Sequence, residues 1–204
     1  MSHNTWFHKV SRVIIVNPLV KTRITPNQLT LVRLVSGLSA AGAMMVGSNT
    51  WLNIGAGLFI FSMLLDRADG DLARITEQMS FNGHKLDLIS DASCNSLIFV
   101  GLGFGLANSS LGMWAIPMGV ISGLAIAAIL LLVVQIESTE GAGAAELDSF
   151  AGFDPDDIII LVPIAILLGW SKYILMAAAI GAPIFLLIFI YLFRHTLKFG
   201  KINF

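Results

Sequence analysis

The sequence predicts an all-α integral membrane protein with six transmembrane helices, preceded by an amphipathic helix that lies at the membrane interface. Of its 204 residues, 56% are hydrophobic and only 12% are charged, and the mean hydropathy is +0.82. The apolar residues gather in runs close to the length of about 20 residues that crosses a bilayer as a helix. We therefore expect one six-helix membrane domain over residues 25–204, with a separate interfacial segment over residues 1–24.

The first 24 residues mix apolar and basic side chains. Trp6 and Phe7 are followed closely by Lys9 and Arg12, and no uninterrupted apolar core of a signal peptide is present. A helix with apolar and basic faces lies in the plane of the interface instead of crossing the membrane. We predict an interfacial helix here, and a disordered tail is the alternative.

The first membrane helix is predicted at about residues 27–47. Thr25 is placed as its N-cap, Pro26 at the first helical position, and Gln28 where its side chain can reach back to the cap. Three polar residues of the opening turns can line a substrate pocket, although capping or snorkelling explains each equally well. They are Asn27, Thr30 and Arg33.

Five further apolar runs predict the remaining spans. They lie at about residues 52–74, 84–107, 112–136, 156–170 and 173–193. Small residues recur through residues 36–43 and 101–107, which permits close contact between helices or between subunits. Packing within one subunit is the expected use.

Acidic side chains stand at the edge of two of these apolar runs, where a charge is costly and marks a functional site. At about 100° per residue, Asp66, Asp69, Gly70 and Ala73 share one face of a helix, with Arg74 at its flank. Asp71 is expected to point away from that face. In the following helix Gly83, Asp87 and Asp91 recur every fourth residue. Two acidic helix faces can therefore meet.

Four carboxylates in a partly desolvated pocket cannot all stay ionised without cations beside them. Oxygen ligands suit Mg²⁺ or Mn²⁺ better than zinc. A diphosphate held by two such ions and by Arg74 is the natural ligand of this arrangement. Gly70 and Ala73 leave space on the same face for a flat group such as a nucleotide base.

These residues reproduce the pattern DxxDGxxARx(8)GxxxDxxxD, and the chain therefore resembles the CDP-alcohol phosphotransferases, also called class I CDP-alcohol phosphatidyltransferases. The upstream stretch ITPNQLTLVRL is similar to the entry of that family's first helix. The resemblance extends over about residues 20–200 and is specific over 25–91. It implies an enzyme that cleaves a CDP-linked donor, passes a phosphoalcohol to an acceptor hydroxyl and releases CMP, in phospholipid biosynthesis.

The resemblance also implies roles for single residues. Asp66, Asp69 and Asp87 would hold two Mg²⁺ or Mn²⁺ ions, and Asp91 would join the metal site and act as the catalytic base. Asp69, Gly70, Ala73 and Arg74 would bind the cytidine and diphosphate. Asn27, Thr30, Arg33, Gly83 and Lys85 remain candidates for the pocket. Members of the family commonly form homodimers, so a homodimer is an open expectation for this chain.

Three other interpretations compete with this one. Paired acids on helices are often solvated faces or ion-pair partners, but the apolar flanks argue against that here. Intramembrane prenyltransferases also bind a diphosphate through two Asp-rich helices, yet they lack the DGxxAR element and space their acidic motifs far apart. A cation or proton transporter would gain nothing from Gly70, Ala73 and Arg74. With a net charge near −1, nucleic acid is not an expected partner.

Basic residues predict the orientation in the membrane. Lys21 and Arg23 precede the first span, Arg74 and Lys85 flank the acidic connection, and Arg194 follows the last span. We therefore expect both termini and the acidic site to face the cytoplasm, in the inner (cell) membrane.

The motif itself does not specify the acceptor alcohol. Residues 137–157 carry seven acids and no base, and we interpret them as a solvated linker or as a lid over the site. A phosphorylated acceptor needs two or more convergent basic residues. Outside the motif, Arg33, Lys85 and Arg194 remain possible, but they would have to come from three different helices. A neutral or cationic alcohol is therefore the expected acceptor.

Overall fold

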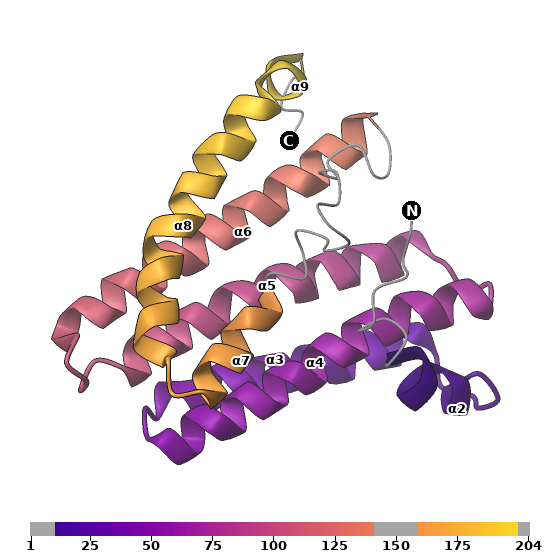
Figure 1. Cartoon of the computed structure of the whole chain (residues 1–204). Helices are drawn as coiled ribbons and strands as arrows, with labels where there is room; N and C mark the ends of the chain where they lie inside the picture. The colour runs from indigo at the N-terminus through magenta and orange to yellow at the C-terminus, as the bar shows by residue number, and fades with distance from the viewer. Residues whose placement is uncertain (1–10, 141–158, 200–204) are drawn as a thin grey trace.

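The computed structural model describes residues 11–140 and 159–199, and in these residues the protein is helical without strands. Figure 1 shows the helices in chain order along the colour bar. They are η1 (Arg12–Val16), α2 (Asn17–Leu19), α3 (Pro26–Met45), α4 (Asn49–Ile75), α5 (Phe81–Gly105), η2 (Gly112–Trp114), α6 (Ala115–Glu140), α7 (Leu161–Leu167), α8 (Ser171–Leu192) and α9 (Arg194–Phe199).

Four stretches of helix in the described residues are long and apolar enough to cross a membrane. They are Pro26–Met45, Gly83–Gly105, Gly112–Glu137 and Ser171–Leu192. The last two present bare apolar surface, with Leu124 66% and Leu187 67% exposed. Lipid tails can cover such a surface where water would not. The prediction of an all-helical membrane protein is thus confirmed.

The count of six spans stays a prediction. Helix α4 has 27 residues, but its carboxyl-terminal turns carry the acidic motif and it is not among the four apolar stretches. Helix α7 has only seven residues, which span about 10 Å at 1.5 Å per residue. The fifth expected span begins at residue 156, so its first residues lie outside those described.

The predicted N-terminal helix is described only in part, because residues 1–10 lie outside the described chain. Residues 11–19 are helical and rest on α4: the Ser11 hydroxyl donates to the Leu64 carbonyl at 2.9 Å. Val16 is buried with Leu65 and Leu72 of the same helix. An interfacial role for residues 1–24 stays a prediction, and so does the lid or linker at 137–157, most of which also lies outside the description.

A capping box fixes the start of α3, as the sequence predicts. The Thr25 hydroxyl accepts from the Gln28 amide at 3.4 Å, and the Gln28 side chain accepts from the Thr25 amide at 3.0 Å. Ser48 and Ser80 cap α4 and α5 with side chains that accept from the first turn, without the reciprocal bond of a capping box. These caps set where each helix begins and hence which residues face the neighbouring helices.

Helix α3 packs against both α4 and α5, and small residues bring α3 and α5 into backbone contact (Figure 1). A methyl group on Gly101 would lie 2.4 Å from the Ala41 carbonyl oxygen, and one on Gly105 would lie 2.0 Å from that of Met44. The small residues near 36–43 and 101–107 are therefore used within one subunit, as expected. Helix α6 then packs along α5, α8 along α6, and α7 against α4.

Candidate functional site

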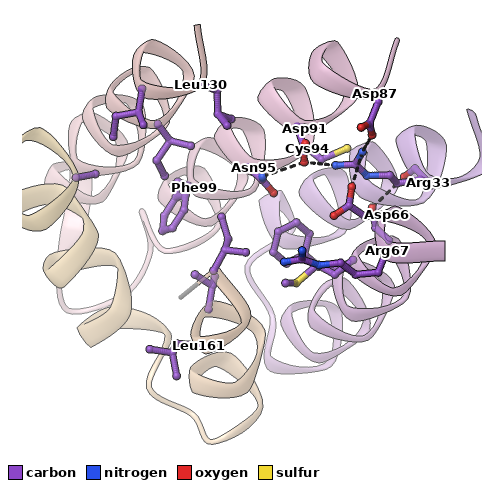
Figure 2. A pocket seen from close by; sticks show the side chains of 18 of the residues that line it. Arg33, Asp66, Arg67, Asp87, Asp91, Cys94, Asn95, Phe99, Leu130 and Leu161 are labelled. Carbon is purple, nitrogen blue, oxygen red and sulfur yellow. Dashed lines mark hydrogen bonds and ion pairs between the residues drawn. The ribbon is translucent and has the colours of Figure 1, made fainter. Parts of the chain in front are cut away.

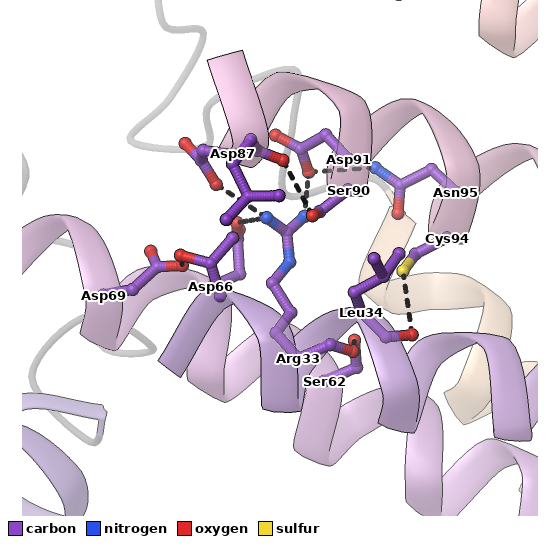
Figure 3. Close-up of polar contacts among 12 residues, drawn as sticks. Arg33, Leu34, Ser62, Asp66, Asp69, Asp87, Ser90, Asp91, Cys94 and Asn95 are labelled. Atoms are coloured by element: carbon purple, nitrogen blue, oxygen red, sulfur yellow. Dashed lines mark hydrogen bonds and ion pairs between the residues drawn. The ribbon is translucent and has the colours of Figure 1, made fainter. Parts of the chain in front are cut away.

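The close packing of α3, α4 and α5 brings the predicted acidic residues together. Asp66 and Asp69 are three residues apart on α4, and Asp87 and Asp91 are four apart on α5, so each pair shares a helix face. Figure 3 shows Asp66, Asp87 and Asp91 around Arg33, which comes from α3, with Asp69 beside Asp66. The two acidic faces meet as the sequence predicts.

Three of the carboxylates have the geometry of a metal site. Asp66, Asp69 and Asp87 each offer one carboxylate oxygen, and these oxygens lie within 4.8 Å of one another. Two oxygens bound to one Mg²⁺ at about 2.1 Å can be at most about 4.2 Å apart, so a small side-chain adjustment closes the set. An all-oxygen donor set of carboxylates fits Mg²⁺ or Mn²⁺. The residues present therefore fit such an ion.

Arg33 is buried in the middle of the cluster, with its side chain 3% exposed. Its Nη1 atom lies 2.8 Å from Asp66 Oδ1 and 2.7 Å from Asp87 Oδ1. Its Nη2 atom pairs with Asp91. The Ser62 hydroxyl of α4 donates to the Arg33 backbone carbonyl at 3.0 Å. The guanidinium is thus held among carboxylates of two other helices. Each charge has a partner, and burying it without one would be costly.

Asp91 stands beside the three-carboxylate group and is not part of it. Its contacts are the Arg33 guanidinium and the Asn95 amide nitrogen at 3.5 Å, one turn further along α5. Asp91 and Asn95 both line the cavity described below. This position leaves Asp91 able to meet a ligand that approaches the three-carboxylate group.

Thr30 orients the Asp69 carboxylate, one of the three in this group. Its hydroxyl lies 2.7 Å from Asp69 Oδ2 and 3.1 Å from the Pro26 carbonyl of its own helix. Both Thr30 and Asp69 are buried. Because the capping box fixes the first turn of α3, it also fixes the hydroxyl that holds Asp69.

A cavity of about 640 Å³ opens beside the carboxylates. Figure 2 shows its polar end at Arg33, Asp66, Asp87 and Asp91, and apolar side chains such as Phe99, Leu130 and Leu161 further away. The apolar part is lined from α4, α5, α6, α7 and α8, and it includes Phe59, Ile126, Val162, Ala178 and Phe185. The cavity therefore joins a charged site to an apolar space inside the helix bundle.

The predicted donor-binding residues lie mostly on this cavity. Asp69, Gly70 and Arg74 line it, whereas Ala73 is not part of the lining. A methyl group built on Gly70 would meet nothing within 4 Å, so this glycine leaves open space. Asp71, which we expect to point away from the acidic face, is not part of the three-carboxylate group, although it also lines the cavity. Its carboxylate lies 3.8 Å from the guanidinium of Arg74, one helical turn further on.

Of the residues predicted as possible pocket residues, only Arg33 lines the cavity; Asn27, Thr30, Gly83 and Lys85 do not. Gly83 instead provides room for α3, because a methyl group there would lie 2.8 Å from Asn27 Oδ1 and 2.9 Å from Ser80 Oγ. The contribution of Gly83 in this structure is thus close packing of α5 against the start of α3.

Three parts of the site were not predicted from the sequence. Arg67 lines the cavity from α4, but in the sequence it marks only the basic flank of a membrane span. Asn95 continues the four-residue spacing of Asp87 and Asp91, and that spacing could have identified it. The apolar wall from α6, α7 and α8 consists of residues that any membrane helix contains, so no local signal distinguishes them.

Comparison with known proteins adds one match. A family model described as CDP-alcohol phosphatidyltransferase matches residues 23–189. That range includes α3, α4 and α5 in full and every residue that lines the cavity. No curated protein matches the chain closely enough to serve as a relative.

Proposed function

The chain belongs to the CDP-alcohol phosphatidyltransferase family, a family of transferases that move a phosphoalcohol from a CDP-alcohol, and from this premise we propose that its acidic cavity is the active site of a metal-dependent enzyme. The observation that carries the proposal is the set of Asp66, Asp69 and Asp87 oxygens within 4.8 Å of one another. This set lies at the polar end of a cavity that Gly70 and Arg74 also line.

Asp66, Asp69 and Asp87 would hold the divalent ions, two in number and Mg²⁺ or Mn²⁺ by their oxygen ligands. When bound, such ions neutralise the diphosphate of the donor and stabilise the charge that develops on the leaving phosphate. Thr30 keeps the Asp69 carboxylate in place through its 2.7 Å hydrogen bond. Asp91 can complete the site from the adjacent turn of α5.

The remaining polar residues would bind the donor and move the proton. Arg74 would pair with the donor diphosphate, and the open space at Gly70 would accept the cytidine. Asp91 would take the proton of the acceptor hydroxyl while the hydroxyl oxygen attacks the β-phosphorus of the donor. The bond from that phosphorus to the bridging oxygen then breaks, and CMP leaves with the bonding electrons.

The apolar wall of the cavity supports a lipid substrate, and the positions of the three basic residues predicted for an acceptor phosphate favour an acceptor without one, although Arg67 also lines the cavity. Its apolar part has room for acyl chains next to the charged end. Lys85 and Arg194, two of the basic residues considered for an acceptor phosphate, do not line it, and Arg33 is held by three carboxylates. We propose one of two transfers in phospholipid biosynthesis. Either a phosphatidyl group passes to a small neutral or cationic alcohol, or a phospho-head-group passes to a diacylglycerol-like lipid.

The membrane arrangement that we propose follows the distribution of basic residues. Six spans and an interfacial N-terminal helix would place both termini and the cavity on the cytoplasmic side of the inner membrane, where CDP-linked donors and Mg²⁺ occur. The four described apolar stretches support the membrane location. A homodimer remains a prediction from the resemblance.

Replacing Gly70 by leucine is expected to prevent donor binding without loss of stability, because the new side chain would enter open space on the cavity wall. Gly57→Leu is the matched control: it lies on the same helix, also meets nothing within 4 Å and does not line the cavity. In thermal unfolding with Mg²⁺, CDP should raise the melting temperature of the wild type and of Gly57→Leu, and should leave that of Gly70→Leu unchanged. An equal rise in the melting temperature of Gly70→Leu would show that the nucleotide base does not bind at this face.

The class of donor can be tested by the same ligand-induced stabilisation. We expect CDP-linked donors to raise the melting temperature of the purified protein in Mg²⁺, by several degrees when the ligand is at about 100 times its Kd. Polyprenyl diphosphates should have little effect. Stabilisation by polyprenyl diphosphates alone would favour a prenyltransferase. Indifference to both, together with ion flux in proteoliposomes, would favour a transporter.

A further inference from the structure

Arg33 occupies a position that affects how many cations the site can accept. Its Nη1 atom contacts Asp66 Oδ1 at 2.8 Å and Asp87 Oδ1 at 2.7 Å, and both residues belong to the three-carboxylate group. Its Nη2 atom pairs with Asp91. Two of the three carboxylates that would bind metal ions are thus already in contact with a fixed positive charge (Figure 3).

The guanidinium is almost fully buried at the polar end of the cavity. Its side chain is 3% exposed, and the backbone of the same residue is held by hydroxyls of Ser36 and Ser62 at its carbonyl. A divalent ion bound at Asp66 and Asp87 would lie a few Å from it. Repulsion between a double and a single positive charge at that distance is strong in a site of low effective dielectric. Arg33 therefore opposes each added cation.

The charges of the contacting groups give the expected number of ions. Four carboxylates and one guanidinium leave about three negative charges. One divalent ion reduces this to about one negative charge, which is still favourable. A second ion would make the site positive and is favoured only when an anion enters with it. The diphosphate of a CDP-linked donor supplies about two negative charges.

We propose that Arg33 limits the site to one divalent ion until the donor binds, so that the second ion and the CDP-linked donor bind together. This inference rests on the proposed metal-dependent function and adds a rule of assembly to it. It makes Arg33 a positioning residue, which acts through the charge of the site without touching the reacting atoms. The consequence is that the complete catalytic site forms only around the donor.

Metal binding without turnover tests the proposal. The number of Mn²⁺ ions bound by the purified full chain in detergent would be measured from the electron paramagnetic resonance signal of free Mn²⁺, with and without CDP as the donor fragment. Wild-type protein is expected to bind one ion without CDP and two with it. Arg33→Met, of similar length without the charge, should bind two ions without CDP, and its first ion at least about tenfold more tightly.

Arg33→Lys separates charge from shape, because lysine keeps the positive charge and loses the forked contacts. It is expected to behave as wild type in ion number. If Arg33→Met does not purify as a folded protein, the wild-type and Arg33→Lys stoichiometries still test the proposal, because two ions bound without CDP by either protein would reject it.

The results that overturn the proposal differ from those that overturn the proposed function. Two ions on the wild-type protein regardless of CDP, or a folded Arg33→Met protein that still needs CDP for its second ion, would reject the role of Arg33 alone. Absence of Mn²⁺ binding by wild type, with and without CDP, would reject the metal-dependent function and this inference with it.

Discussion

Replacing any one of Asp66, Asp69 or Asp87 by asparagine is expected to lower CMP release about 10³-fold, which corresponds to about 4 kcal/mol in the activation free energy. Asparagine keeps the shape of the side chain but removes one of three anionic oxygens that lie within 4.8 Å of one another. The remaining two carboxylates would bind a divalent ion weakly and in the wrong place. CMP formed from a CDP-linked donor can be measured by chromatography.

Glu77→Gln is the matched control for these variants. Glu77 is an exposed acid just after α4, and it does not line the cavity, so the same change in charge should leave CMP release near the wild-type rate. A comparable loss in Glu77→Gln would show that general surface charge, and not the metal-binding group, determines the rate.

Asp91→Asn should lower CMP release by a similar factor for a different reason. Removing a general base lowers the rate about 10² to 10⁴-fold. The metal site itself should stay intact, because Asp91 is outside the three-carboxylate group. Mn²⁺ binding and CDP-induced stabilisation should therefore persist in Asp91→Asn and be lost in Asp69→Asn. Full activity of Asp91→Asn would exclude it as the base.

Sequence spacing predicted the acidic faces because a helix converts a spacing of three or four residues directly into a shared face. Asp66 with Asp69 and Asp87 with Asp91 need only the helices themselves to be aligned. The capping box at Thr25 was equally predictable, since it depends on residues within one turn. These local relations account for the confirmed part of the site.

Contacts between different helices could not be predicted from the residue spacing. Arg33 was predicted only as one of several pocket residues, yet it contacts Asp66, Asp87 and Asp91, because α3 packs against both acidic helices. Gly83 was placed in the pocket, but it serves the contact with Asn27. Both outcomes depend on which helix faces meet, which the phase of a single helix does not determine.

The apolar elements show the same limit. Hydropathy alone predicted a full span at 156–170, and the α-helix within the described part of that region is the seven-residue α7. Its residues Leu161 and Val162 line the cavity together with residues of α6 and α8. The same apolar residue types face lipid and face an internal cavity, so the wall of the proposed substrate space could not be predicted.

The most direct test of the metal-dependent transferase is CMP release by the purified wild-type protein after treatment with EDTA. We expect the rate from a CDP-linked donor to fall by at least about 10³-fold on chelation. Added Mg²⁺ or Mn²⁺ in excess of the chelator should restore it, because oxygen ligands accept either ion, and Asp69→Asn should not recover. CMP release that continues at the original rate in EDTA would contradict the account, since the three carboxylates would then have no ion to hold.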